Sequence, residues 1–403
     1  METKEKFILM FKDYEVLSFV VIYGERDKIE LLEELEYYDR APYGMKKAEN
    51  KEEANRILYR FFNARAIPCS RWDYDEIIKA TGCKDSLRLI FKGHGLSLSN
   101  HYWFKKEGEN LKYDDINFFT NKWDDTFARA VLSHDYEKLK TADLNVPDIL
   151  TPGWGVKGWL CEEDGPRLYK AGIHKGHYEE CLGEVLASRL ANRLLNKGEA
   201  LEYELKTFAG QYCSVCKTMI NIDEELVPLS QVLPRDLYLL YSGKSNDRQK
   251  SDEFFKRVPE YGLNGLYEFF VKITCIRSLV FVSDLHFDNL SIIRNMKTGE
   301  LKVAPLYDLG GSFGSGETGK KVLSNINKGT YLLIYFIYGG LDPNWDYSWY
   351  DKNKLIGFED EIRDILSKSD FYNEQLIDNI IDVYHHQKET LDELADNCAQ
   401  KSV

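Results

Sequence analysis

Residues 153–196 contain the feature that most limits how this chain can fold. A glycine-rich turn, "GWGVKGW", opens a strand–turn–strand pattern over 153–172. A helical pattern follows over 177–196, with one apolar face formed by Leu182, Val185, Leu186, Leu190 and Leu194. The turn residues and the change of period predict a hairpin that leads directly into an amphipathic helix.

The segments around this hairpin and helix differ in type. Strand patterns continue over 201–210, 212–220 and 225–233, whereas the chain after 234 is mainly helical, over 251–262, 263–284 and the C-terminal tail. A hairpin with a Lys-Thr-Gly turn interrupts the helices at 290–308. A sheet-rich part followed by a helix-rich part predicts a two-lobed α+β protein. We expect a sheet-rich N-lobe over 145–234 and a helical C-lobe over 235–403.

The first 144 residues form an additional segment before these lobes. They predict a hairpin over 7–22, helices over 50–66 and 74–82, and two strands around a glycine turn over 86–106. Prolines and turn formers in "TADLNVPDILTPGWG" (141–155) mark the boundary. We therefore expect an accessory α+β subdomain over 1–144.

Charge and hydropathy limit the partners of the protein. The net charge is −13 and the pI is about 5.3, which disfavours nucleic acid as a direct partner because nucleic acid is a polyanion. The longest apolar runs, 16–23 and 331–338, are far shorter than the roughly 20 residues that cross a membrane. We expect a cytoplasmic protein without membrane association.

Acids and one amide lie in apolar surroundings late in the chain. "VSDLHFDNLSII" (282–293) places Asp284 five residues before Asn289, and "APLYDLGG" places Asp308 before two glycines. These residues either cap turns or hold a metal and a reacting hydroxyl. Carboxylate and amide oxygens suit Mg²⁺, and one carboxylate near the acceptor hydroxyl completes what phosphoryl transfer from ATP needs. We predict Asn289 and Asp308 as metal ligands and Asp284 as the catalytic base.

Transfer from ATP also needs a cradle for the phosphates. The loop formed by Gly153, Trp154, Gly155, Val156 and Lys157 is the candidate, since backbone N–H groups in glycine-rich loops approach phosphate oxygens. An ordinary hairpin turn would have the same pattern, so the loop alone is a weak signal.

A lysine and a glutamate follow the loop at suggestive positions. Lys170 ends the second strand of the hairpin, where its ammonium could bind phosphates. Glu184 lies near the apolar face of the helix over 177–196 and is the predicted partner of Lys170, with Glu180 as the alternative. We include Lys170 and Glu184 among the catalytic residues.

Taken in order, these motifs resemble those of the HipA-like kinases, including the CtkA-type bacterial Ser/Thr protein kinases. The matching pieces are "LTPGWGVKGW", "RLYKAG", "GEVLASRLANRLL", "SDLHFDNLSII" and "APLYDLGGS", and they cover roughly residues 145–315. The resemblance implies a bilobal protein-kinase-like fold that uses ATP and Mg²⁺. It implies the phosphate role for Lys170, the catalytic role for Asp284 and the metal role for Asn289 and Asp308. His286 then braces the loop, and Asp288 is a turn acid.

The resemblance leads us to expect a serine/threonine protein kinase with an unknown protein substrate. It also makes an antitoxin-like protein a possible partner. Two alternatives stay open: a kinase-fold enzyme acting on a small molecule or lipid headgroup, and a nucleotide-binding pseudokinase that regulates a partner. The chain departs from the family in one respect. HipA-type enzymes are regulated by autophosphorylation of a hydroxyl in the phosphate loop. Thr151 is the only hydroxyl-bearing residue in 150–159, so we do not expect self-inhibition by that route.

Overall fold

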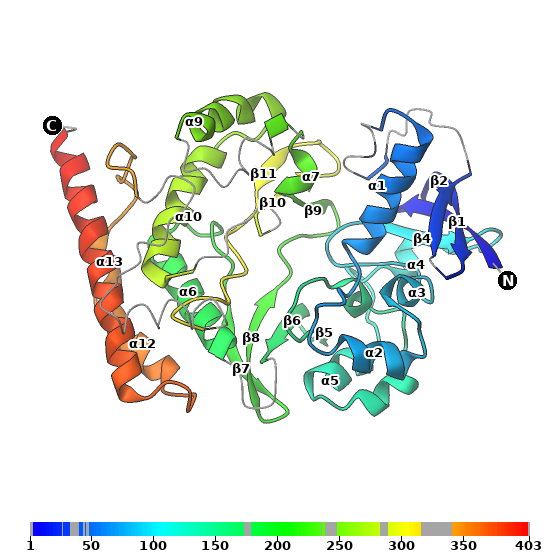
Figure 1. The fold of residues 1–403 in the computed structure, drawn as a ribbon, viewed down its shortest axis with the longest axis horizontal. Coiled ribbons are helices and arrows are strands. Elements are labelled where there is room, and N and C mark those ends of the chain that lie inside the picture. The colour runs from blue at the N-terminus through cyan, green and yellow to red at the C-terminus, as the bar shows by residue number, and fades with distance from the viewer. Residues whose placement is uncertain are drawn as a thin grey trace. The chain divides into compact units, whose positions relative to one another are not determined.

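The computed structural model of the chain describes residues 3–25, 27–32, 40–42, 45, 48–172, 179–234, 236–237, 248–282, 289–315 and 341–401. It divides into two compact units, one of residues 1–173 with 220–227, and one of residues 174–219 with 228–403. Each unit contains both helices and strands (Figure 1), which confirms the predicted α+β class. The predicted domain limits at 144/145 and 234/235 stay a prediction.

The first unit begins with a four-stranded antiparallel sheet in the order β3-β2-β1-β4. Its strands are β1 (Thr3–Phe11), β2 (Tyr14–Tyr23), β3 (Lys28–Leu31) and β4 (Tyr102–Lys106). The predicted hairpin over 7–22 is confirmed, with Lys12 at a φ of 50° in the turn between β1 and β2.

Helices α1 to α5 belong to the same unit (Figure 1). They are α1 (Lys51–Asn63), α2 (Tyr74–Thr81), α3 (Ser86–Ile90), α4 (Tyr113–Ile116) and α5 (Thr126–Leu132), with 3₁₀ turns at Tyr136–Lys140 and Pro147–Leu150. The predictions of α1 and α2 are confirmed. Asn50 caps α1 by accepting a hydrogen bond from the N–H of Glu53, and Gly82 ends α2 at a φ of 62°.

The prediction of two strands over 86–106 is half wrong. Only β4 is a strand, because residues 86–90 form helix α3. The carboxylate of Asp85 accepts a hydrogen bond from the N–H of Arg88 and so caps this helix. Leu87, Leu89 and Ile90 are all buried and the partly buried Arg88 lies between them, a pattern that does not distinguish strand from helix.

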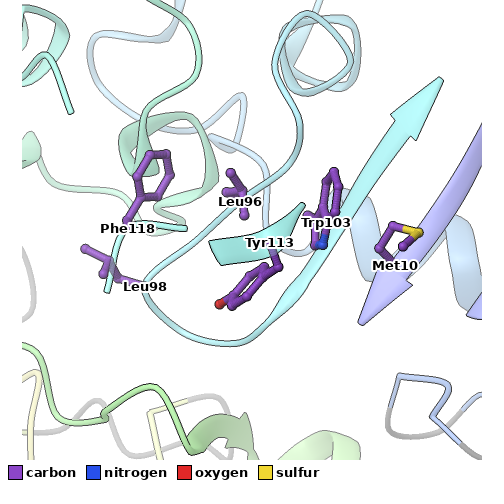
Figure 2. Close-up of a cluster of buried hydrophobic side chains, with 6 residues drawn as sticks. All are labelled: Met10, Leu96, Leu98, Trp103, Tyr113 and Phe118. Atoms are coloured by element: carbon purple, nitrogen blue, oxygen red, sulfur yellow. The ribbon is translucent and has the colours of Figure 1, made fainter. Parts of the chain in front are cut away.

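A buried cluster joins the sheet to the segments that follow it. Figure 2 shows its six residues, Met10, Leu96, Leu98, Trp103, Tyr113 and Phe118. Trp159, which lies just after the glycine-rich loop, packs against this cluster. The hydrophobic core of the N-terminal region therefore extends beneath the glycine-rich hairpin.

That hairpin consists of β5 (Lys157–Glu162) and β6 (Gly165–Ala171), as predicted. Residues 220–227 also belong to the first unit, since Leu226 donates a hydrogen bond to the carbonyl of Ser99, and His101 bonds the carbonyl of Glu224.

The second unit contains α6 and most of the later helices. Helix α6 (Glu179–Leu194) confirms the predicted helix but not its amphipathic character, since residues 181–188 are all buried, and the hairpin of β7 and β8 follows it. The remaining elements are β7 (Glu204–Phe208), β8 (Gln211–Lys217), α7 (Leu229–Val232), α9 (Arg248–Arg257), a 3₁₀ turn (Val258–Tyr261), α10 (Leu266–Val280), β10 (Ser291–Asn295), β11 (Leu301–Val303), a 3₁₀ turn (Lys352–Leu355), α12 (Phe358–Leu366) and α13 (Glu374–Lys401).

The predicted strand over 225–233 is wrong in its second half. Strand β9 (Glu224–Pro228) ends at the proline, and a short helix begins at Leu229. Pro228 has no N–H to continue a sheet ladder, whereas Leu229 and Val232 are both buried one helical turn apart. The helix that results is α7.

No helix in the part of the chain that the structure describes is long and apolar enough to cross a membrane.

Candidate active site

The glycine-rich loop connects the 3₁₀ turn at Pro147–Leu150 to strand β5. Gly153 has a φ of 108°, a conformation that L side chains rarely adopt. The ammonium of Lys157 folds back across Gly153 and donates a hydrogen bond of 3.0 Å to the carbonyl of Pro152. A Cβ at position 153 would collide with that ammonium, which is the end of a flexible side chain and can move, so the positive φ is what favours glycine here.

At Gly158 a side chain is excluded by packing and not by the backbone conformation. A Cβ at this position would lie 2.9 Å from the Cβ of Ala128 in helix α5. Packing of β5 against α5 therefore excludes a side chain at Gly158, whether or not a phosphate approaches the backbone there. By contrast, a Cβ at Gly155 would meet no atom within 4 Å.

A buried acid closes the base of the loop. Asp148, which precedes the loop, is 1% exposed and accepts a hydrogen bond of 2.8 Å from the N–H of Trp159, which follows the loop. This bond connects the two ends of the loop. Burial raises the pKa of Asp148 to about 7. Asp148 belongs to none of the motifs singled out in the sequence, although an acid inside the apolar run "VPDIL" was a usable signal.

The hydroxyl of Thr151 forms a hydrogen bond with the segment that leads into the loop. The side chain is buried, and its Oγ1 donates a hydrogen bond of 2.9 Å to the carbonyl of Pro147. This geometry favours a structural role for Thr151.

Lys170 lies opposite the glycine-rich loop. In the β5–β6 ladder it is the direct partner of Lys157, and Ala171 donates a hydrogen bond of 2.9 Å to the carbonyl of Val156. The structure therefore brings Lys170 and the loop together on adjacent strands. Because directly paired residues of an antiparallel ladder point to the same face, Lys157 and Lys170 lie on one face of the hairpin.

Glu184 lies in the second unit, in helix α6. It is 2% exposed, and its Oε2 accepts a hydrogen bond of 2.5 Å from the hydroxyl of Ser214 in β8. A buried carboxylate needs such partners. Ser214 was not identified from the sequence. The pairing of Glu184, or of Glu180, with Lys170 stays a prediction.

The hairpin of β10 and β11 carries the two predicted metal ligands at its open end. Ile292 pairs with Val303, and Ala304 donates a hydrogen bond of 2.9 Å to the carbonyl of Ser291. Asn289 precedes this hairpin and Asp308 follows it, and both are partly exposed. The predicted hairpin around the Lys-Thr-Gly turn is confirmed, with Gly299 at a φ of 77°.

Asp308 has an unusual backbone conformation. Its φ is 58°, in the left-handed region that non-glycine residues seldom occupy. Phe281 and Phe313 also have positive φ values, 56° and 52°, and their rings are 5.7 Å apart. Such strain is often retained at functional positions, which makes Asp308 a candidate site residue on its own evidence.

Helix α6 packs directly on the segment that follows Asp308. A Cβ on Gly183 would lie 2.6 Å from the carbonyl oxygen of Ser312 and 2.7 Å from the hydroxyl of Ser315. The Ser315 hydroxyl itself donates to the carbonyl of Gly310, at 2.5 Å. The helix that carries Glu184 and the segment that follows Asp308 are thus held against each other.

Three residues of the predicted catalytic loop, Asp284, His286 and Asp288, lie outside the described residues. Their roles stay predictions.

No model of a known protein family matches the sequence, and no curated protein matches it significantly. Among solved structures, the chain is similar to the Helicobacter pylori proinflammatory kinase CtkA, with 18% identity, coverage of 61% of this chain and 95% of that chain, and a TM-score of 0.45. It is also similar to a chain of the Shewanella oneidensis MR-1 toxin–antitoxin complex of HipA, HipB and its operator DNA. The identity there is 12%, the coverage 97% of this chain and 99% of that chain, and the TM-score 0.49. Both TM-scores are below 0.5, so residue roles rest on this chain's own geometry.

Proposed function

We propose that this protein is an ATP- and Mg²⁺-dependent serine/threonine protein kinase with a bilobal kinase-like fold. In this proposal Lys170 and the loop formed by Gly153, Trp154, Gly155, Val156 and Lys157 bind the phosphates of ATP. Asn289 and Asp308 hold Mg²⁺, Asp284 accepts the proton of the acceptor hydroxyl, and Glu184 orients Lys170.

The observation that carries the proposal is the β10–β11 hairpin. Because its strands are antiparallel, the segments that contain Asn289 and Asp308 leave it at the same end. The hydroxyls of Ser291 and Tyr307, 2.7 Å apart, link the two segments just inside those residues. An amide oxygen and a carboxylate from this end, completed by phosphate oxygens and water, fit the octahedral oxygen site that Mg²⁺ requires.

The lysine that ends the loop and the lysine opposite it also fit a polyphosphate. Lys157 and Lys170 are direct partners across β5 and β6. ATP, when bound, supplies the phosphoryl group, and Mg²⁺ neutralises its charge. The chain's own contribution is then to place cations, oxygen ligands and one carboxylate around fixed positions.

Two other functions use the same groups. A kinase-fold enzyme could phosphorylate a small molecule or lipid headgroup, and a pseudokinase would bind ATP without transferring phosphate. The kind of acceptor distinguishes the two enzymes, and the absence of any transfer distinguishes the pseudokinase. An antitoxin-like partner and a cytoplasmic location stay predictions.

The test is incubation of the protein with γ-labelled ATP and Mg²⁺ and three kinds of acceptor: a mixed protein fraction, small alcohols, and vesicles that contain inositides. We expect label on serine and threonine of protein acceptors. Label only on an alcohol or lipid would favour the small-molecule kinase, and ATP binding without any transfer would favour the pseudokinase. If the protein does not bind ATP, all three functions are excluded.

A further inference from the structure

We propose that Arg71, Trp72 and Asp73 form a clamp that holds the glycine-rich loop in position for the phosphates of ATP. Arg71 and Trp72 are then positioning residues supplied by the N-terminal region. This inference rests on the proposed function, because it assigns the clamp to the nucleotide-binding step.

The first half of the clamp is a buried ion pair. The side chains of Arg71 and Asp73 are each 1% exposed, and the guanidinium meets the carboxylate at 2.7 Å and 3.3 Å through two nitrogens. A bidentate pair of this kind fixes the plane of the guanidinium. The Nη2 of Arg71 then donates a hydrogen bond of 3.1 Å to the carbonyl of Lys157, the first residue of β5.

The second half of the clamp is at the surface. The N–H of Trp72 donates a hydrogen bond of 3.4 Å to the carbonyl of Trp154 within the loop. The two indole rings are in an edge-to-face arrangement with centroids 6.4 Å apart. Trp72 is 48% exposed and Trp154 is 40% exposed, so this ring pair contributes little to the hydrophobic core.

The position of these contacts indicates what they do. Arg71 bonds the end of the loop, at Lys157, and Trp72 bonds its middle, at Trp154. Between these points lies Gly155, where the backbone has open space around it. A loop with two glycines loses much conformational freedom when it binds a ligand, and contacts that order it beforehand reduce that cost.

A purely structural reading accounts for the pair of Arg71 and Asp73 but not for the exposed tryptophans. Exposed aromatic contacts of this kind add little to folding stability, yet this pair lies on the one loop that is predicted to touch ATP. For Trp72 the clamp therefore predicts an effect on ATP affinity that is larger than its effect on stability.

The experiment measures binding of a non-hydrolysable ATP analogue with Mg²⁺, and of adenosine, by calorimetry. The proteins compared are the wild type, Trp72→Ala, Arg71→Lys and the control Tyr59→Ala. Tyr59 is a 39% exposed aromatic residue of α1, and among the described residues no hydrogen bond or ring contact joins it to the glycine-rich loop. Arg71→Lys keeps the charge opposite Asp73 but removes the planar fork. Thermal unfolding of each protein measures its stability.

We expect Trp72→Ala and Arg71→Lys to weaken binding of the ATP analogue about tenfold, which corresponds to about 1.4 kcal/mol. Adenosine, which has no phosphates, should bind all four proteins equally, and the melting temperature of Trp72→Ala should match that of Tyr59→Ala. In turnover the same variants should raise the KM for ATP more than they lower kcat.

Two results would overturn the clamp while leaving the proposed function intact: unchanged affinity for the ATP analogue in both variants, or an equal loss of affinity for the analogue and for adenosine. A wild-type protein that binds no ATP analogue would overturn the proposed function as well as the clamp.

Discussion

Gly183 of helix α6 is in direct contact with Ser312, at a distance that leaves no room for a side chain. A Cβ on Gly183 would lie 2.6 Å from the carbonyl oxygen of Ser312. This contact ties the helix that carries Glu184 to the segment that follows Asp308, the predicted metal ligand. Movement of one of these elements must therefore affect the other.

Gly183→Ala should damage both stability and activity. In an ordinary helix interior this change stabilises by about 0.5–1 kcal/mol, since alanine has the higher helix propensity. Here the added methyl group collides with backbone, so we expect a loss of about 1–3 kcal/mol in the free energy of unfolding and a reduced rate of phosphate transfer. Urea unfolding measures the first effect. A stabilised variant would show that the contact is not tight.

Gly158→Ala in strand β5 and Gly155→Ala in the glycine-rich loop form a matched pair. The first methyl group would lie 2.9 Å from the Cβ of Ala128, whereas the second would meet nothing within 4 Å. We expect Gly158→Ala to lower the free energy of unfolding by about 1–3 kcal/mol and Gly155→Ala to change it by less than about 0.5 kcal/mol. Equal stability of the two variants would contradict the packing of β5 against α5.

Asp308 should store backbone strain. The variants Asp308→Gly and Asp308→Ala both remove the carboxylate, but only alanine retains the cost of a φ of 58°. We expect the glycine variant to be more stable than the alanine variant by about 1–2 kcal/mol, while neither transfers phosphate. Thermal and urea unfolding compare the two variants directly. A more stable alanine variant would mean that the backbone is not strained at this position.

Asp148 should make folding depend on pH. Burial raises the pKa of Asp148 to about 7 from an ordinary value of 3.8, with Arg71 opposing the shift and Asp125 adding to it. Between these values the folded protein keeps a proton that the unfolded chain releases, so the contribution of Asp148 to stability falls as pH rises from about 4 to 7.

The variant Asp148→Asn removes this titration. Its stability relative to the wild type should increase between pH 5 and pH 8, by a few kcal/mol at most, since one unit of pKa corresponds to about 1.4 kcal/mol. Urea unfolding at pH 5, 6, 7 and 8 measures the difference. A difference that stays constant across this range would show that Asp148 does not titrate there.

Local signals explain which elements were predictable. Helix α1 has an asparagine cap, acids in its first turn and a basic residue in its last turn, and helix α2 ends at Gly82. The segment over 86–90 was misassigned because buried Leu87, Leu89 and Ile90 show no clear period. Leu87 and Leu89 have the spacing of a strand, whereas Leu87 and Ile90 have the spacing of a helix, so the pattern fits either element.

The candidate site was predictable only in part, because some of its contacts join residues far apart in the sequence. Asn289 and Asp308 belong to short motifs, and the hairpin between them has a recognisable turn. The contact of Arg71 with Lys157 joins residues 86 positions apart, and no spacing rule connects them. Long-range contacts of this kind become visible only once the fold is known.

The most direct test of the whole account is phosphate transfer by site variants. With γ-labelled ATP and Mg²⁺, Asp284→Ala should lose about 10²- to 10⁴-fold in rate, the usual effect of removing a general base. Asp308→Asn, which keeps a residue that tolerates a positive φ, should lose at least as much because a metal ligand is impaired. Asp288→Ala is the matched control and should retain wild-type transfer. Wild-type rates in both Asp284→Ala and Asp308→Asn would contradict the proposed site.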